Sequence, residues 1–182
     1  VGYRRRILSE NLRIVRNQVL SMGEMIKVGI ADWKICNSPD QITTIGLGSC
    51  VGVVLFSERS NCCGLLHILL PSSLEIKNNS NRSKFADTGI EDLINELVRQ
   101  GIPKSRMIAK IAGGATMFQC NYSSDLGSIG DRNVKAVKEN LSSYAIPVIA
   151  EDVGKDYGRT IIFNPSTKKL VVRSAGKKDI VI

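Results

Sequence analysis

The chain has 182 residues, of which 43% are apolar and 23% charged, so it has the length of one domain and can bury a core. Its longest apolar runs fall well short of the ~18 residues of a membrane-spanning helix, and no secretory signal is recognisable, so we expect no membrane insertion. The net charge of +8 suggests a nucleic-acid-binding module, but only 5% of the residues are aromatic and the basic residues are interspersed with acidic ones, so we expect no nucleic-acid partner.

The first 24 residues differ from the rest in charge pattern. Arg4, Arg5 and Arg6 are followed by leucine and valine residues at a spacing that fits a basic amphipathic helix or a loose arm. We therefore expect residues 1–24 to be an N-terminal extension whose deletion leaves activity intact. Residues 25–182 are expected to form the domain.

Alternating apolar residues predict a strand over residues 25–33, a turn at residues 38–40 and a further strand over residues 41–45. Two apolar runs follow, over residues 49–57 and 64–70. Turn-forming Ser, Asn and Gly residues separate them, which predicts a β-hairpin.

This hairpin carries Cys50 and the only histidine of the chain, His67. Opposite residues of an antiparallel pair share a constant index sum, and side chains alternate between the two faces. Because 50 and 67 sum to an odd number, any connection with an even number of residues places both side chains on the same face. The tightest register makes them direct neighbours, whereas a longer loop makes them diagonal ones.

A thiol is nucleophilic as the thiolate, so Cys50 needs a proton acceptor, and His67 is the one imidazole that can serve. The sequence therefore predicts a catalytic Cys50–His67 pair. The alternative is a structural one, in which Cys50 is a buried core thiol and His67 a hydrogen-bonded core residue.

The chain contains five cysteines, an odd number, which argues against a disulfide framework and favours the reducing cytoplasm. Adjacent Cys62 and Cys63 lack the gap of two to four residues with which paired thiolates bind zinc. We therefore predict no metal site.

Helical periodicity occurs twice in the second half of the chain. An apolar stripe begins after Ser83 and ends at Gly101, and a second begins near Asp131, which we expect to be the N-cap. Between the two helices, a strand over residues 107–111 runs into Gly113-Gly114, whose missing side chains permit a tight turn or a close contact with the catalytic hairpin.

A strand over residues 147–151 and a final hairpin over residues 159–172, turning at Asn164-Pro165, complete the chain. The order of strands, two helices and more strands predicts the α/β class. We expect a single-domain layered α/β fold with a mixed, largely antiparallel sheet and two main helices.

Six segments resemble, in order, the chemoreceptor glutamine deamidase family, CheD. They are GLGSC from Gly46, HILLP from His67, KFADTGIEDLINELVRQG from Lys84, AKIAGGATMF from Ala109, IGDRNVKAVKENL from Ile129 and AEDVGKDYGRTIIFNPSTKKLVVR from Ala150. The resemblance covers roughly residues 25 to 175. The family's catalytic pattern is a cysteine in GLGSC, a histidine seventeen residues later and a threonine six residues earlier, which corresponds to Cys50, His67 and Thr44.

The resemblance implies a protein-glutamine deamidase that converts glutamines of methyl-accepting chemoreceptors to glutamate through a thioester on Cys50. His67 is then the general base and acid, Thr44 orients His67, and backbone N–H groups of residues 48–50 stabilise the oxyanion. Receptor methylesterase activity is an expected side reaction, and no cofactor is required. The expected partners are the cytoplasmic domains of the receptors and a CheC-type phosphatase, and the expected location is the cytoplasm.

Two other functions remain open at this stage. A weakly catalytic or non-catalytic adaptor would regulate the CheC-type phosphatase without changing the receptor. An acyltransferase would use the same Cys50–His67 pair but transfer the acyl group to an amine.

Overall fold

The computed structural model describes residues 23–75, 80–116 and 128–182. The predicted N-terminal extension, residues 1–24, lies outside the described residues except for its last two. Glu24 contacts the domain, because its backbone N–H donates to the Asp40 carboxylate at 2.8 Å. None of the helices in the described ranges is long and apolar enough to cross a membrane.

The strands of the described residues form two five-stranded sheets. The sheet that we call the outer sheet has the order β1-β3-β8-β9-β10. Its strands are β1 (Met25–Val28), β3 (Gln41–Leu47), β8 (Arg159–Phe163), β9 (Leu170–Arg173) and β10 (Ile180–Val181). The central sheet has the order β2-β5-β4-β6-β7. Its strands are β2 (Asp32–Asn37), β5 (Cys62–Ile68), β4 (Val51–Phe56), β6 (Ile108–Gly113) and β7 (Val148–Val153).

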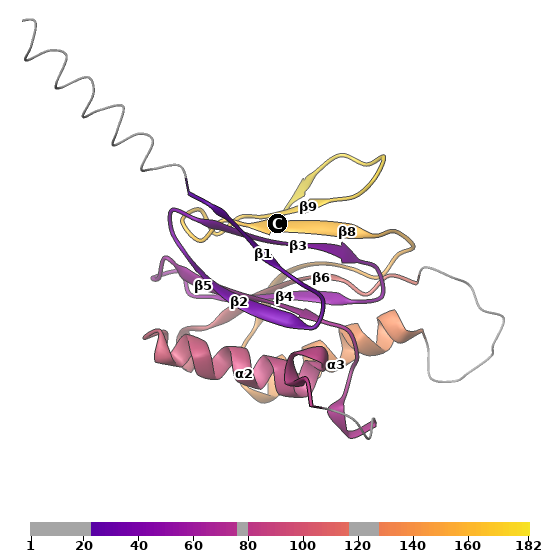
Figure 1. The fold of residues 1–182 in the computed structure, drawn as a ribbon, viewed down its shortest axis with the longest axis horizontal. Helices are drawn as coiled ribbons and strands as arrows, with labels where there is room; N and C mark the ends of the chain where they lie inside the picture. Colours follow the sequence, from indigo (N-terminus) through magenta and orange to yellow (C-terminus); the bar gives the residue numbers. More distant parts are fainter. Residues whose placement is uncertain (1–22, 76–79, 117–127) are drawn as a thin grey trace, which may run out of the picture.

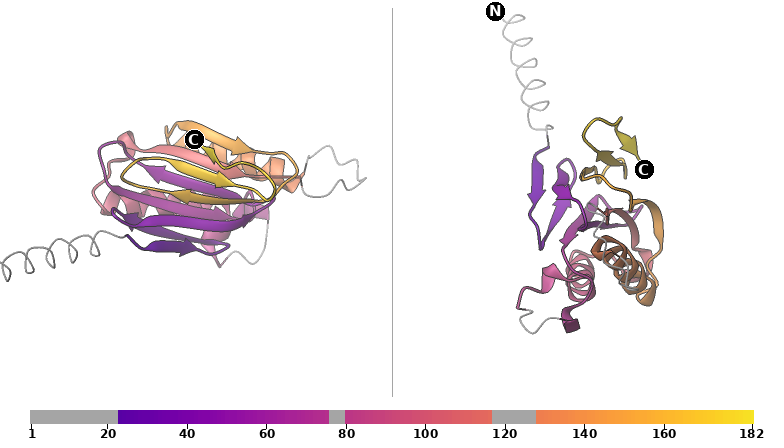
Figure 2. Two further views of the ribbon diagram at one scale, coloured as in Figure 1. Left: turned by 90° about the horizontal axis from the view of Figure 1, so that it is seen from above. Right: turned by 90° about the vertical axis from the view of Figure 1, so that its right-hand side faces the viewer.

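Two α-helices of the described residues, α2 (Ala86–Arg99) and α3 (Ile129–Ser143), cover the face of the central sheet that points away from the outer sheet (Figure 1). The second view of Figure 2 shows them side by side under that sheet. The connections that the structure describes contain three single-turn helices: η1 (Ser73–Glu75), η2 (Arg82–Lys84) and η3 (Lys104–Arg106). The molecule is therefore layered, with helices, central sheet and outer sheet in that order.

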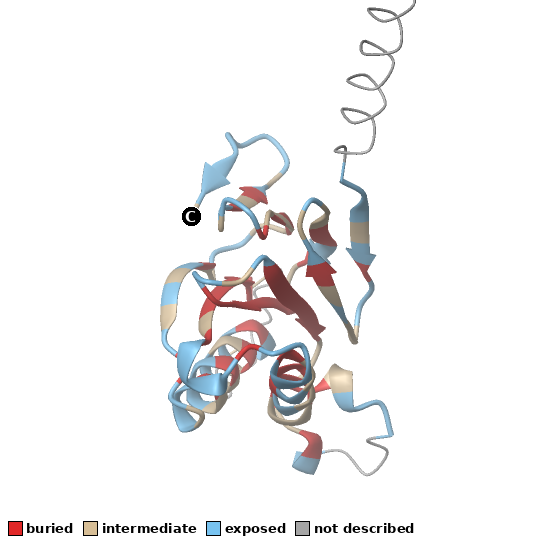
Figure 3. Ribbon diagram, turned by 90° about the vertical axis from the view of Figure 1, so that its left-hand side faces the viewer, coloured by how far each residue is buried: buried red, intermediate tan, exposed pale blue. Residues whose placement is uncertain are grey.

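The inner strands of the central sheet are buried on both faces, whereas the edge strands β2 and β7 are partly exposed. Every residue of β4 and β5 is buried, and Figure 3 shows the buried residues concentrated in this layer. One apolar cluster joins the sheet to the helices and includes Leu66, Leu93 and Val137. A second cluster fills the space between the two sheets and includes Val54 and Ile161. Continuous apolar runs such as VGVVLF are typical of strands with both faces covered.

The predicted fold class is confirmed: one domain of mixed α/β structure, two main helices and largely antiparallel pairing with parallel β1–β3 and β6–β7 pairs. The strands are divided between two sheets instead of forming one. The strand predicted over residues 25–33 is two strands, because the chain turns at Gly29–Ala31, where Ala31 has φ +56°. Helix α3 begins two residues earlier than predicted.

The predicted N-cap of α3 was wrong. Ser128 is the cap residue, and its hydroxyl accepts from the Asp131 backbone N–H at 3.1 Å. Asp131 is the third residue of the helix, and its carboxylate accepts from the Ser128 backbone N–H at 3.2 Å. The two residues form a capping box, in which each side chain pairs with the backbone of the other.

Candidate active site

Thr44 and His67 come from different sheets and meet in the interior. Thr44 lies on β3 of the outer sheet and His67 on β5 of the central sheet, and both are fully buried. The Thr44 hydroxyl oxygen lies 2.7 Å from Nδ1 of His67 and 2.8 Å from the backbone oxygen of Val28. The Thr44–His67 contact therefore links the two sheets beside the histidine ring.

The two contacts of Thr44 determine the tautomer of His67. A hydroxyl has one proton to donate, and the carbonyl oxygen of Val28 can only accept, so the proton of Thr44 goes to Val28. Nδ1 of His67 must then be the donor in the second contact. In the neutral ring this leaves the lone pair on Nε2, which is the atom that a general base needs.

The lone pair on Nε2 of His67 is not used in a hydrogen bond within the described residues, although the atom is buried. Burial also disfavours the charged ring and lowers the pKa of His67 to about 4. At neutral pH the resting ring is therefore an uncharged base with a free acceptor atom.

Cys50 and His67 are diagonal neighbours across the β4–β5 ladder. Gly52 is the residue directly opposite His67, and six residues connect the paired Phe56 and Cys63. As the index sum predicts for an even connection, Cys50 lies on the face of the central sheet that carries His67, the face towards the outer sheet. The offset of two residues corresponds to a Cβ separation of about 7–8 Å or somewhat less.

The resting pair is not hydrogen-bonded, since Nε2 of His67 has no partner. Cys50 is 7% exposed, and burial raises the pKa of its thiol above the usual value, while its own backbone N–H lowers it to a smaller extent. The site at neutral pH therefore contains a thiol and a neutral imidazole. It is not a preformed thiolate–imidazolium pair.

Three consecutive carbonyl groups before β4 accept hydrogen bonds from the end of β6 and from α3. The donors are Ala115 N–H to Gly48 O at 2.7 Å, the Asn133 side chain to Ser49 O at 2.8 Å and Gly114 N–H to Cys50 O at 2.7 Å. These bonds hold residues 48–50 in a bent conformation beside the central sheet, and we call this segment the nucleophile loop after the role that the sequence predicts for Cys50.

Two N–H groups of the same loop, those of Ser49 and Cys50, have no acceptor among the described residues, whereas the Gly48 N–H donates to Gly46 O at 3.0 Å. The β4–β5 ladder ends at the Val51–Ile68 pair, and the next N–H, that of Leu69, donates to Lys84 O at 2.9 Å instead of to β4. Within the described part of the chain, neither Ser49 N–H nor Cys50 N–H donates to an oxygen, and the Cys50 N–H lies beside its own sulfur. Two N–H donors next to a nucleophile are the arrangement that stabilises an oxyanion.

Gly113 permits the close approach of β6 to the nucleophile loop. It has φ +114°, and a Cβ at this position would lie 2.2 Å from the carbonyl oxygen of Cys50. The close contact predicted for Gly113-Gly114 with the catalytic hairpin is therefore confirmed, and its physical cause is the absence of a side chain.

Asn133 was not predicted as a site residue. Its fully buried amide donates both to Ser49 O and, at 3.0 Å, to Leu69 O. The sequence did contain a pattern that could have identified this residue. Asn133, Val137 and Leu141 have the helical spacing i, i+4 and i+8, so the Asn133 amide lies on the apolar stripe of the helix.

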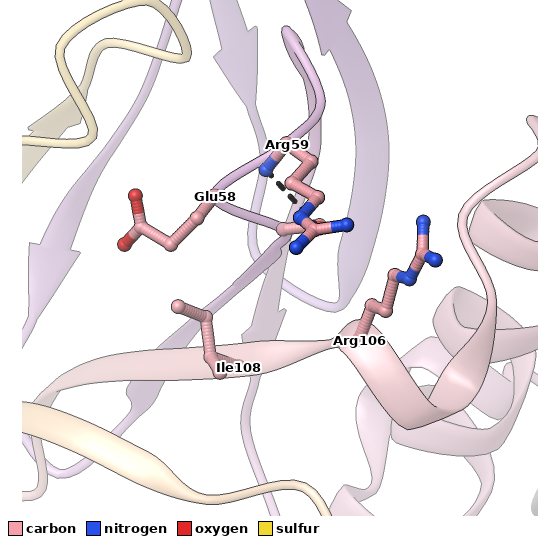
Figure 4. Close-up of a pocket in the computed structure, with 5 residues that line it drawn as sticks. Glu58, Arg59, Arg106 and Ile108 are labelled. Atoms are coloured by element: carbon pink, nitrogen blue, oxygen red, sulfur yellow. Dashed lines mark hydrogen bonds between the residues drawn. The ribbon is translucent and has the colours of Figure 1, made fainter.

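A hollow of about 340 Å³ lies elsewhere on the molecule, and Figure 4 shows the side chains that line it. It is lined by Ser57, Glu58, Arg59, Arg106 and Ile108. Its first three residues belong to the turn between β4 and β5, whereas Cys50 and His67 lie at the other end of those strands. The hollow therefore has no part in the candidate active site.

Comparison with known proteins places these residues in a family. The family model described as CheD chemotactic sensory transduction matches residues 69–174. A protein of Lachnoclostridium phytofermentans named as a probable chemoreceptor glutamine deamidase CheD is 53% identical over 156 residues, covering 86% of this chain and 97% of the relative. A protein of Caldanaerobacter subterraneus with the same name is 50% identical, covering 84% and 94%.

The chemoreceptor glutamine deamidase CheD of Halalkalibacterium halodurans is 46% identical, covering 87% of this chain and 100% of the relative. In all three comparisons the aligned region covers 94–100% of the relative. This chain belongs to the CheD family.

Proposed function

We propose that this protein is a hydrolase of amide C–N bonds that deamidates glutamine side chains of chemoreceptors, with Cys50 as nucleophile, His67 as general base and acid and Thr44 as the residue that orients His67. Relatives that are 46–53% identical bear the name of this activity. The observation that carries the residue roles is the Thr44–His67 contact, which leaves Nε2 unpaired on the sheet face that also carries Cys50.

The reaction begins with a proton transfer. Because both groups are neutral at rest, we propose that the Cys50 proton moves to Nε2 of His67 as the sulfur attacks. A small rotation of the Cys50 or His67 side chain, or one intervening water, brings the diagonal pair into hydrogen-bond range. The imidazolium that forms is stabilised by the hydrogen bond from Nδ1 to the Thr44 hydroxyl.

The sulfur forms a bond to the side-chain carbonyl carbon of the glutamine, and the carbonyl oxygen becomes an oxyanion. The unpaired N–H groups of Ser49 and Cys50 are the proposed donors to this oxygen. One such donor contributes about 2.7–4 kcal/mol to the stabilisation of a transition state. Buried donors are effective because they need no reorganisation during the reaction.

Collapse of the intermediate breaks the C–N bond, and the departing nitrogen takes the proton from Nε2 of His67 and leaves as ammonia. A water molecule then attacks the thioester and gives a proton to the same Nε2. Cleavage of the C–S bond releases glutamate, and the sulfur recovers its proton from His67. The net reaction consumes one water and forms one ammonia.

A receptor methyl ester offers the same acyl carbon with a different leaving group, so methylesterase activity is proposed as a side reaction. Methanol then leaves in place of ammonia. The substrate side chains lie on the cytoplasmic domains of the receptors, and the proposed site of action is the cytoplasm. A CheC-type phosphatase is the second proposed partner.

Mass spectrometry of receptor cytoplasmic fragments tests the proposal. Incubation with the protein is expected to exchange NH2 for OH at specific glutamines and to release ammonia, whereas Cys50→Ala releases none. Cys63→Ala is the matched control, because Cys63 is a buried thiol on β5 that forms no part of the site. An adaptor would bind the receptor without a mass change, and an acyltransferase would form amides with added amines.

A further inference from the structure

Asn133 joins three segments that are distant in the sequence. Its side chain extends from α3, is fully buried, and donates to Ser49 O at 2.8 Å and to Leu69 O at 3.0 Å. The last pair of the β4–β5 ladder is Val51–Ile68, so Ser49 lies two residues beyond its end on one strand and Leu69 one residue beyond it on the other. The amide of Asn133 therefore occupies the opening between the separated strand ends.

The orientation of the Asn133 amide is determined by its contacts. Both protons of Nδ2 are used by the two carbonyls, and the flipped amide would place Oδ1 against two acceptor oxygens. Oδ1 itself is buried and has no partner in the described ranges. An unpaired buried acceptor costs stability. The two donated bonds are thus the contribution that this side chain makes.

The Ser49 carbonyl and the Cys50 N–H belong to one planar peptide group and point in opposite directions. A bond from Asn133 to Ser49 O therefore directs the Cys50 N–H away from α3. Ala115 acts in the same way on the preceding peptide group: its N–H binds Gly48 O at 2.7 Å and so directs the Ser49 N–H. Hydrogen bonding at a carbonyl also polarises the N–H of the same peptide and strengthens it as a donor.

We propose that Asn133 is a positioning residue that orients the Cys50 N–H as an oxyanion donor. This inference rests on the proposed deamidase function. Asn133 does not touch the reacting atoms. Its effect on the reaction passes through the Ser49–Cys50 peptide group.

Two reactions of the same sulfur separate oxyanion stabilisation from general support of Cys50. Deamidation passes through an oxyanion. Alkylation of Cys50 by iodoacetamide displaces iodide from a methylene carbon and forms no oxyanion, so it needs the sulfur but not the N–H donors. Both rates are measured on the full chain, with alkylation resolved by mass spectrometry because the chain has other cysteines.

Asn133→Ala is expected to lower kcat for receptor glutamine by about 100-fold, the effect of losing one oxyanion donor, while KM and the alkylation rate of Cys50 stay near the wild-type values. Asn133→Ser keeps one donor and is expected to lose less, and it serves where the alanine variant does not fold. Asn140→Ala is the matched control, because within the described residues the side-chain amide of Asn140 donates to Ala136 O of its own helix and not to the nucleophile loop. It is expected to leave both reactions unchanged.

Equal losses of deamidation and alkylation in Asn133→Ala and Asn133→Ser would overturn the proposal, because Asn133 would then support Cys50 as a whole. Unchanged deamidation in both variants would overturn it as well. Failure of the underlying function has a different signature: the wild-type chain would release no ammonia, or Cys50→Ala would still release it.

Discussion

The Thr44 hydroxyl oxygen lies 2.7 Å from Nδ1 of His67 and donates its hydrogen bond to the Val28 carbonyl, so a residue of the outer sheet selects the tautomer of a histidine in the central sheet. The ring cannot turn over without losing this bond. The proposed role of Nε2 as a base therefore depends on the packing of one sheet on the other.

Removal of the Thr44 hydroxyl is expected to lower kcat for deamidation while the protein still folds. Thr44→Val leaves Nδ1–H of His67 without an acceptor, and we expect kcat for deamidation to fall by about 10- to 100-fold, by analogy with the loss of a residue that orients a metal-binding histidine. Thr44→Ser keeps the hydroxyl and is expected to retain most activity. Ammonia release and thermal unfolding are the measurements.

Thr43→Val is the matched control for this experiment. Thr43 is the preceding residue of β3, is also buried, and donates at 2.7 Å to Ile161 O without contacting His67. Its substitution is expected to lower the free energy of unfolding by about 1–3 kcal/mol with kcat nearly unchanged. Equal kcat values for Thr43→Val and Thr44→Val would contradict the orienting role of Thr44.

The protonation of His67 can be followed directly, because the chain has one histidine. Burial lowers the pKa of His67 to about 4, so its imidazole C–H signals in NMR are expected to titrate near pH 4. Deamidation, which needs the neutral ring, should accordingly stay active well below pH 6. A midpoint close to 6.5, the ordinary value for histidine, would show that burial does not lower the pKa of His67.

The same shift predicts the pH dependence of stability. Since the folded pKa of His67 lies below the unfolded value of about 6.5, unfolding takes up a proton between about pH 4 and 6.5. The free energy of unfolding should therefore fall as the pH drops through this window. Denaturant melts of the wild-type chain and of His67→Gln measure the slope, and we expect it to be shallower in the variant.

The raised pKa of Cys50 predicts how its reactivity depends on pH. Burial disfavours the thiolate, so the rate of alkylation of free enzyme by iodoacetamide should rise with pH above neutrality, with its midpoint above the ordinary thiol value of about 8.5. His67→Gln is expected to leave this profile nearly unchanged. A rate plateau extending into the acid range, lost in His67→Gln, would instead indicate a preformed ion pair.

Gly113→Ala is expected to disturb the site from the side of β6. A Cβ here would lie 2.2 Å from Cys50 O, so the nucleophile loop must move and the bond from Gly114 N–H is lost. We expect a destabilisation of about 1–3 kcal/mol and a loss of deamidase activity. Gly176→Ala is the control: it has φ +67° but open space around it, and it should cost about 1–2 kcal/mol with activity retained.

Breaking the ion pair between Asp152 and Arg159 is expected to lower the free energy of unfolding, because the Arg159 side chain is fully buried and lies 2.8 Å from the Asp152 carboxylate. Arg159→Met leaves a buried carboxylate with only the Lys155 contact, and the expected cost is about 3–5 kcal/mol. Arg173→Met is the control, because its pair with Asp179 is about half exposed and should contribute about 0–1 kcal/mol. Similar melting temperatures for the two variants would contradict this ranking.

Local patterns in the sequence determined much of the architecture. The apolar runs around residues 50 and 67 predicted the β4–β5 hairpin, and the parity of the two positions predicted that Cys50 and His67 share a face if an even number of residues connects the strands, which is the case. Both main helices followed from their apolar stripes. These features depend on the side-chain periodicities of strands and helices, 2 and 3.6 residues. Each periodicity lies within one element and can be read from the amino-acid sequence.

Only the tertiary structure decided how these elements meet. Sheet pairing divides the strands between two layers, and Thr44 reaches His67 across that boundary from 23 positions away in the sequence. Asn133 lies 84 positions from Ser49, so no local spacing connects them. Hydrogen bonds between distant segments depend on where packing brings each backbone group, and that placement arises only when the apolar faces of separate elements are buried against one another.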